Sequence, residues 1–181
     1  MTAPESRVVF ASSMEGLWRG LAPARAEELA AFAKAGVVGP TPRFLAAYPV
    51  EAYSEVMDTC ARTRFGHLGE LERYTEVGRL FVNGYSKTMV GSALLALLRV
   101  LGPRRTLERT TRNIRTANSY TEASLETLAP NHHRLRVNYV AHPGFYRGII
   151  EGTCLHAGAK ELRVDLAEFT DNAPIYDVRW A

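Results

Sequence analysis

The chain has 181 residues, of which 46% are hydrophobic and 23% are charged, and its net charge is +3. A chain of this size forms about one domain and buries roughly 70% of its unfolded surface, so it needs neither a disulfide nor a metal to fold. Two cysteines exclude a disulfide framework, no secretory signal is visible, and the longest uncharged stretch in the middle of the chain, residues 88–98, is too short to span a bilayer. We therefore expect a single domain over residues 1–181, located in the cytoplasm.

The first 64 residues predict one short strand and two helices. Arg7 to Phe10 is a short apolar segment typical of an edge strand. A helix is predicted from Pro23 to Lys34, which is rich in Ala, Glu and Leu and is followed by a cluster of glycine and proline. A second helix is predicted from Pro49 to Arg64, where apolar residues recur at helical spacing: Tyr53, Val56, Met57 and Cys60.

Residues 70–101 carry a helical pattern without proline. An unbroken helix of this length would extend about 48 Å, three times the radius of gyration of about 16 Å expected for the chain, so we expect a break near Asn83-Gly84. From Val90 onward the pattern is apolar nearly all round, which is typical of a central helix buried by its neighbours. Gly102-Pro103 ends this pattern, and a further helix is predicted from Pro103 to about Asn118.

The C-terminal third predicts two pairs of strands around one helix. A hairpin is expected at residues 130–133, and apolar residues alternate in three segments typical of half-buried strands: Arg134 to Tyr139, Leu162 to Leu166 and Tyr176 to Trp180. The helix from Pro143 to Gly158 carries Gly144, Gly148 and Gly152 four residues apart, so one of its faces must pack very close to a neighbour. Helices followed by strand-strand-helix-strand-strand indicate an α+β fold, with the N-terminal helices packed on an antiparallel sheet.

The cysteines and histidines do not form a recognisable metal site or catalytic site. Cys154 and His156 could ligate a transition metal in principle, but residues two apart on a helix point about 200° away from each other. Cys60 and Cys154 lie on apolar helix faces, where a free cysteine usually behaves as a small hydrophobe rather than as a nucleophile. We therefore expect no cofactor, no metal and no catalytic residue.

Positive charge is concentrated between Arg99 and Arg115, where six arginines surround a single acid, Glu108. Three of them share one face of the helix predicted after Pro103, and we call this the arginine face: Arg105, Arg109 and Arg112. Such a face can bind phosphate, nucleic acid or an acidic partner. A solvated helix face with ion pairs to Glu108 and nearby carboxylates is the simpler interpretation, and the lack of interleaved aromatic residues argues against nucleic acid.

Several short motifs follow one another between Thr41 and Trp180: Tyr48-Pro49-x-x-x-Tyr53, Gly78-Arg79-x-Phe81, Thr88-x-x-Gly91, Leu101-Gly102-Pro103-Arg104, Asn118, Tyr146-x-Gly148, Gly158-Ala159 and Tyr176-Asp177-Val178-Arg179-Trp180. Their order and spacing resemble a family of uncharacterised proteins with many paralogues in myxobacteria. That family is similar to a wider fold group, which contains the haem-nitric-oxide sensor domains, the vinyl-4-reductase-type ligand domains and the TRAPP vesicle-tethering subunits.

The resemblance implies a non-enzymatic sensing or scaffolding domain, often dimeric, with a pocket or channel between helices and sheet. The chain departs from the fold group in two places. The sensor domains carry a Tyr-x-Ser-x-Arg clamp for the haem propionates, whereas this chain has Tyr85-Ser86-Lys87. Some vinyl-reductase-type domains carry cysteines near the last two strands, whereas residues 168–180 contain none. The resemblance therefore does not extend to haem or zinc.

We predict a non-enzymatic sensing or protein-interaction module that forms a homodimer and binds a small apolar ligand between helices and sheet. The expected pocket residues are Phe81, Tyr85, Met89, Phe145 and Ile149. A filled core would show the same pattern and is the simpler interpretation of these residues. The alternatives are an adaptor that binds an anionic partner or nucleic acid through the arginine face, and an uncharacterised enzyme, which would need polar groups converging on a pocket.

Overall fold

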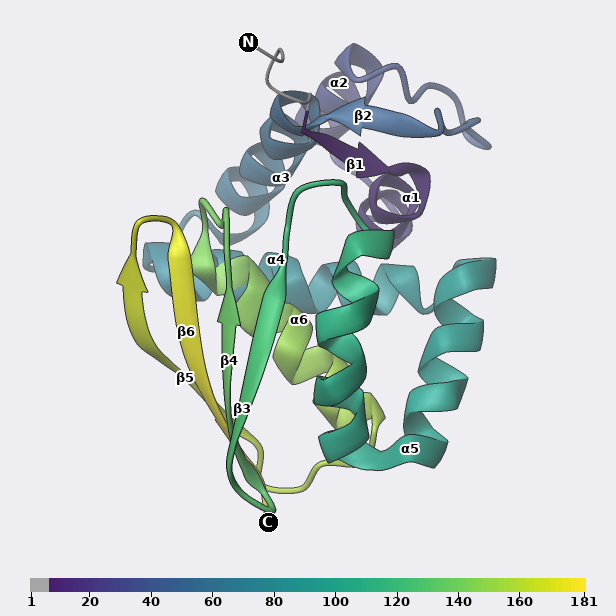
Figure 1. Ribbon diagram of the computed structural model, residues 1–181. Helices are drawn as coiled ribbons and strands as arrows, with labels where there is room; N and C mark the ends of the chain where they lie inside the picture. The colour runs from purple at the N-terminus through teal and green to yellow at the C-terminus, as the bar shows by residue number, and fades with distance from the viewer. Residues whose placement is uncertain (1–6) are drawn as a thin grey trace, which may run out of the picture.

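The structure is a computed structural model that describes residues 7–181, apart from the side chain of Asn113. The first part of the chain is mainly helical (Figure 1): β1 (Val8–Phe10), α1 (Ala11–Gly20), α2 (Ala26–Lys34), β2 (Ala47–Pro49), α3 (Val50–Phe65), α4 (Glu70–Tyr85), α5 (Met89–Asn113) and the 3-10 turn η1 (Ile114–Thr116). The second part forms β3 (Ala123–Ala129), β4 (His132–Val137), α6 (Pro143–His156), β5 (Arg163–Thr170) and β6 (Ala173–Arg179). None of the described helices combines the length and the hydropathy needed to cross a membrane.

The N-terminal layer consists of α1, α2 and α3 beside the β1–β2 pair. The two strands are antiparallel, with Val9 opposite Tyr48. The apolar residues that predict α3 are all buried in this layer: Tyr53, Val56, Met57 and Cys60. Helix α1 was not predicted from the sequence, and its side chains Met14 and Leu17 are fully buried in the same core.

The glycine residues of α6 pack directly against the backbone of α4. A side chain at Gly144 would overlap the carbonyl oxygen of Leu71, and one at Gly148 would overlap that of Thr75. On the opposite helix, Gly78 leaves room for the carbonyl oxygen of Phe145. The expected close contact is therefore confirmed, and the neighbour is a helix rather than the sheet on this face of α6.

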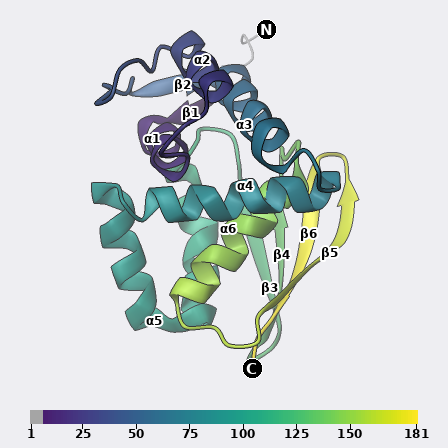
Figure 2. The same ribbon diagram turned by 180° about the vertical axis from the view of Figure 1, so that it is seen from behind.

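The main sheet has the strand order β3-β4-β6-β5, and every neighbouring pair is antiparallel. Its inner face buries Leu135, Val137, Tyr176 and Val178 together with Ile150 and Cys154 of α6. Seen from behind, α6 lies across the sheet and α4 crosses over α6 (Figure 2). The order of helices followed by β3-β4-α6-β5-β6 confirms the predicted α+β fold.

The β3–β4 hairpin is tighter than expected. Its turn is formed by Pro130-Asn131, and His132 and His133 already belong to β4. His133 is fully buried, and its ring stacks on that of Trp180 with 5.1 Å between the centroids. The aromatic partner from the end of the chain explains why this histidine lies in the core and not in the turn.

A sharp bend divides α5 into two arms that run in opposite directions (Figure 1). The bend is at Gly102, whose φ of +76° lies in the region that glycine adopts without strain. We call residues 89–101 the outer arm and residues 103–113 the inner arm. The bend confirms the predicted boundary at Gly102-Pro103.

The outer arm is not the buried central helix that its apolar pattern predicts. The side chains of Met89 and Val100 are 86% and 84% exposed. The break in the chain also comes slightly later than expected, because α4 ends at Tyr85 and Thr88 starts a new helix by accepting a hydrogen bond from the backbone N–H of Gly91 at 2.9 Å. This turn directs the outer arm away from the core, so only one of its faces is covered.

Candidate functional site

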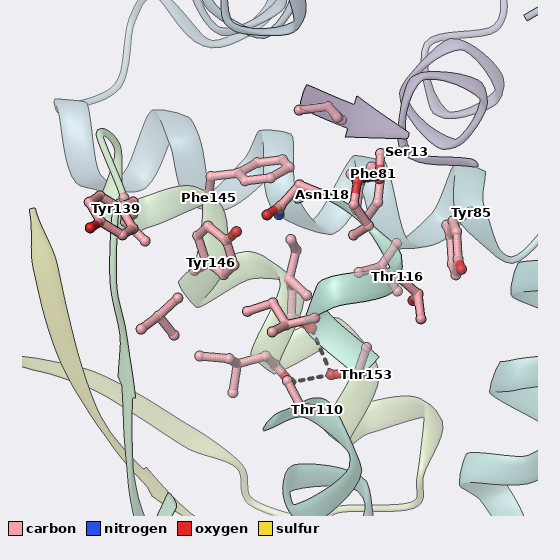
Figure 3. A pocket seen from close by; sticks show the side chains of 18 of the residues that line it. Ser13, Phe81, Tyr85, Thr110, Thr116, Asn118, Tyr139, Phe145, Tyr146 and Thr153 are labelled. Atoms are coloured by element: carbon pink, nitrogen blue, oxygen red, sulfur yellow. Dashed lines mark hydrogen bonds between the residues drawn. The ribbon is translucent and has the colours of Figure 1, made fainter. Parts of the chain in front are cut away.

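A cavity of about 320 Å³ lies between the helices and the sheet (Figure 3). Its volume is within the range of about 300 to 1,000 Å³ that is usual for small-molecule sites. Most of its wall is apolar, with side chains from β1, α3, α4, α5, β4 and α6: Val9, Met57, Phe81, Leu95, Leu98, Leu135, Val137, Phe145, Ile149 and Ile150. Every layer of the fold therefore contributes to one space.

The bend at Gly102 and the close contact of α4 with α6 position this wall. The outer arm of α5 contributes Leu95 and Leu98, and the inner arm contributes Thr106 and Thr110. Because α4 and α6 touch through their glycine residues, Phe81 and Phe145 are brought within 5.6 Å of each other, measured between ring centroids. The cavity is the space enclosed by the two arms of α5, α6 and the sheet.

Three tyrosines from distant parts of the chain meet in the wall: Tyr53 of α3, Tyr120 of the loop after η1 and Tyr146 of α6. Burial raises the pKa of Tyr53 and of Tyr146, and raises the pKa of Tyr120 to about 12. The hydroxyls of Tyr146 and Tyr120 are near enough to that of Tyr53 to add to this effect. We call the three residues the tyrosine cluster, and its hydroxyls remain protonated donors at neutral pH.

Hydrogen bonds from neighbouring residues hold the cluster in place. The Tyr146 hydroxyl donates to Oγ1 of Thr121 at 3.3 Å. The side-chain oxygen of Asn118 accepts hydrogen bonds from the backbone N–H groups of Tyr120 at 3.1 Å and Thr121 at 2.7 Å, which fixes the loop that carries Tyr120. Figure 3 shows Asn118, Tyr146 and Phe145 directed toward the same space.

The charged side chains of the wall are all basic. Arg7 lies over the ring of Tyr139, with 4.3 Å from Cζ to the ring centroid, and 5.9 Å from the ring of Tyr120. Arg109 of the inner arm and His142 also line the cavity. Within the described part of the chain, no Asp or Glu contributes to the wall.

Four of the five pocket residues expected from the sequence line the cavity: Phe81, Tyr85, Phe145 and Ile149. Met89, the fifth expected pocket residue, does not line the cavity, because it begins a new helix after the turn at residues 86–88 and is 86% exposed. The other four side chains line an open cavity. The simpler interpretation of these residues, a filled core, therefore does not hold at this place.

The three residues of the arginine face, Arg105, Arg109 and Arg112, are all exposed on the inner arm. Among the described residues none of the three forms an ion pair, because Glu108 pairs with Arg104 at 3.2 Å instead. Arg115 pairs with Glu122 at 3.0 Å. The structure thus places the three guanidinium groups on the surface without the carboxylate partners that the simpler interpretation assumed.

The two cysteine thiols are unreactive at neutral pH. Cys60 and Cys154 are fully buried, and burial raises the pKa of each thiol to about 12, so neither forms a thiolate at neutral pH. In the part of the chain that the structure describes, no group of three His, Cys, Asp or Glu side chains could hold a metal ion.

Sequence reasoning missed the tyrosine cluster and Arg7. Their positions, from 7 to 146, are too far apart in the chain for any local pattern to connect them. A signal was nevertheless present, because Tyr53, Asn118 and Tyr146 are among the residues on which the family resemblance rests. Some polar and aromatic residues in such a pattern are not needed to form a helix or a strand. These residues are candidates for a shared site.

The α+β fold is similar to that of H-NOX proteins. The H-NOX protein from S. oneidensis in the Fe(II)NO ligation state is similar with a TM-score of 0.65 and 9% identity, over 95% of this chain and 99% of that chain. The Fe(II) unliganded H-NOX protein from K. algicida is similar with a TM-score of 0.61 and 12% identity, over 94% and 95% of the two chains. At these identities the likeness concerns the fold alone.

The chain itself belongs to the family described as "Protein of unknown function (DUF2378)", whose model matches residues 7–181. No curated protein matches the chain. The family and the similar structures confirm the resemblance to an uncharacterised family in the fold group of the haem-nitric-oxide sensors.

The cavity wall does not fit a haem group. Haem iron needs an axial ligand such as a free imidazole or a thiolate, and His142 is the one histidine in the described wall. Its Nε2 lies 3.3 Å from Asp58 and its Nδ1 lies 3.6 Å from Glu70. Its ring stacks on Tyr74 with 3.7 Å between the centroids. Nε2 is thus directed at a carboxylate, and the stacked ring holds Nδ1 on the side of Glu70, where it is buried without a hydrogen-bond partner among the described residues. Burial makes the phenols of the wall resist forming the phenolate that would ligate iron.

Proposed function

We propose that this chain is a non-enzymatic sensing module that holds a small, mainly apolar molecule in the cavity between helices and sheet. The observation that carries the proposal is the wall of the cavity, in which side chains from six elements converge on about 320 Å³ of open space. The fold is compatible with this function, since the similar H-NOX structures include one in an Fe(II)NO ligation state.

The position of the cavity suits a sensor because a ligand would touch both arms of α5. Leu95 and Leu98 come from the outer arm, and Thr106 and Thr110 come from the inner arm. A molecule that binds one arrangement of the arms better than another shifts the population toward that arrangement. We further propose that the module is a homodimer, which would cover the apolar residues that the outer arm exposes.

Native mass spectrometry of the purified protein tests the proposal directly, because it detects co-purified small molecules. The matched variants are Ile149→Trp, which fills the cavity, and Leu155→Trp, which adds the same ring to an exposed residue of the same helix. We expect Ile149→Trp to abolish ligand binding and Leu155→Trp to retain it. Equal binding by the wild type and by both variants would place the ligand outside the cavity.

The arginine face supports a second candidate function, an adaptor for an anionic partner. The specific observation is that Arg105, Arg109 and Arg112 are exposed and unpaired among the described residues, whereas Arg104 and Arg115 each have a carboxylate partner. If the face contacts the phosphates of a single-stranded oligonucleotide, the affinity falls steeply with salt, and each Arg→Ala lowers the slope by about one. Binding that ignores salt would leave this face as a solvated surface.

A further inference from the structure

We infer that the ligand of the cavity is an amphiphile with one anionic head group, which the tyrosine cluster and Arg7 bind while the apolar wall surrounds its chain. The inference rests on the proposed function and specifies the chemistry of the ligand at that same site. Three observations carry it: the donors at one end of the cavity, the sign of the charge in its wall and the apolar remainder.

Unpaired hydrogen-bond donors lie at one end of the cavity. Each phenol has one O–H group. The hydroxyl of Tyr146 already donates to Thr121 and that of Tyr120 also interacts with Thr121, whereas the hydroxyl of Tyr53 forms no hydrogen bond within the described chain although the residue is only 6% exposed. Arg7 is held beside the cluster by its contacts with the rings of Tyr120 and Tyr139. No ion pair engages its guanidinium among the described residues. A group that binds both the hydroxyl of Tyr53 and the N–H groups of Arg7 must accept several hydrogen bonds.

The sign of the charge selects an anion. Arg7 and Arg109 line the cavity, and the described wall contains no carboxylate. His142 also lines it but is already directed at Asp58 outside the wall. Glu51 lies near enough to raise the pKa of Tyr120 but does not line the cavity. A charge buried in an apolar site is tolerated only with a partner and hydrogen bonds. For an anion, this wall supplies a charge partner and hydrogen-bond donors. For a cation, it supplies no carboxylate.

The rest of the wall sets the body of the ligand. Away from the cluster most of the lining surface is apolar, with Leu95, Leu98, Phe81 and Ile149 among its side chains, although hydroxyls such as those of Thr106 and Thr110 also line it. A ligand without an apolar part would leave this surface uncovered, and a purely apolar ligand would leave the buried hydroxyl of Tyr53 without a hydrogen-bond partner. A carboxylate with an alkyl chain satisfies both ends.

The test compares three probes with the same alkyl chain and different heads, namely decanoate, decanol and decylammonium, by calorimetric titration of the full-length protein. We expect decanoate to bind at least ten-fold more tightly than decanol, and decylammonium to bind most weakly. Arg7→Gln and Tyr53→Phe should each weaken decanoate about ten-fold or more and change decanol little. Arg43→Gln removes an exposed arginine outside the wall and should change neither affinity.

The outcomes separate the inference from the proposed function. Equal affinity for decanoate and decanol, stronger binding of decylammonium, or decanoate affinity that ignores both Arg7→Gln and Tyr53→Phe overturns the anionic head group and leaves an apolar ligand site intact. If none of the three probes binds, or if Ile149→Trp binds all of them as the wild type does, the cavity is not a ligand site of this kind and both conclusions fail.

Discussion

Glu28 of α2 is a fully buried carboxylate that pairs with Arg64 of α3. Its two oxygens accept hydrogen bonds from Nε and Nη2 of Arg64 at 2.6 and 2.8 Å. Burial on its own raises the pKa of Glu28, but the hydrogen bonds from Arg64, the backbone N–H of Arg25 and the hydroxyl of Thr63 outweigh it and hold the pKa below its usual value. A lowered pKa means that the contribution to stability is complete above the unfolded-state pKa of about 4.3 and is lost as the pH falls through the folded-state pKa.

We therefore expect Glu28→Gln to lower the free energy of unfolding at pH 7 by about 3 kcal/mol, because Arg64 loses the charge it pairs with in a buried site. The difference from the wild type should shrink as the pH falls below about 4. Urea unfolding at several pH values measures both effects. Glu27→Gln is the matched control, since Glu27 pairs with Arg62 at the exposed surface, and its loss should be at most about 1 kcal/mol. Equal losses for the two variants would contradict this account.

The close contact between helices α4 and α6 depends on the glycine residues at their interface. A leucine is the better helix former by about 1 kcal/mol, but at Gly148 its Cβ would overlap the carbonyl oxygen of Thr75 and approach the Cα of Gly78. We expect Gly148→Leu to destabilise the protein by about 3 kcal/mol or more, because the two backbones must separate. Thermal unfolding measures the effect.

Gly69→Ala is a suitable comparison for this variant, because its new methyl group would meet only the mobile carboxylate end of Glu72. We expect its melting temperature to stay close to that of the wild type. A Gly148→Leu variant that melts at or above the wild-type temperature would show that α4 and α6 are further apart than described.

The limits of sequence reasoning are visible in the same elements. The spacing of Gly144, Gly148 and Gly152 predicts a close neighbour, because a helix face without side chains cannot otherwise be buried. It does not say which neighbour, since Gly78 lies far away in the chain. The apolar pattern after Val90 predicts burial and fails, because periodicity describes a helix but not the direction in which the preceding turn sends it. Thr88, a residue type favoured at helix N-caps, was the local sign that a new helix begins there.

The site shows the same division. Phe81, Tyr85, Phe145 and Ile149 could be placed together from helical spacing and from the expected packing of one helix on another. The tyrosine cluster could not, because its members come from α3, a loop and α6 and only the folded chain brings them together. An open cavity could not be predicted either, since the same apolar residues fill a core or line a pocket depending on the angle between the elements that carry them.

At the scale of the whole molecule, the outer arm leaves an apolar stripe uncovered. Met89, Ala93, Ala96 and Val100 follow one another at spacings of four, three and four and are all exposed. Contiguous apolar surface of this kind marks an interaction site in most soluble proteins. The proposed homodimer would pair this stripe with its copy.

We expect sedimentation velocity to show a dimer for the wild type and a monomer for the double variant Met89→Lys and Val100→Lys, because two buried charges on each stripe would face their copies. Val38→Lys, which alters a residue that is 64% exposed outside α5, is the control and should sediment like the wild type. A double variant that remains dimeric would place the interface elsewhere.

The cavity also lies where two hydrophobic cores meet. One core joins α1 to α4 with Phe145, the other joins the sheet to Ile150, Cys154 and the inner arm, and Tyr146 contacts both. Regions with separate cores can open independently, each with its own free energy. A bound molecule that touches both cores ties their openings together, so amides of α3 and of β4 should exchange with solvent at more similar rates when the cavity is occupied. Occupancy would then be recorded in the cooperativity of unfolding, even where the average positions of the atoms change little.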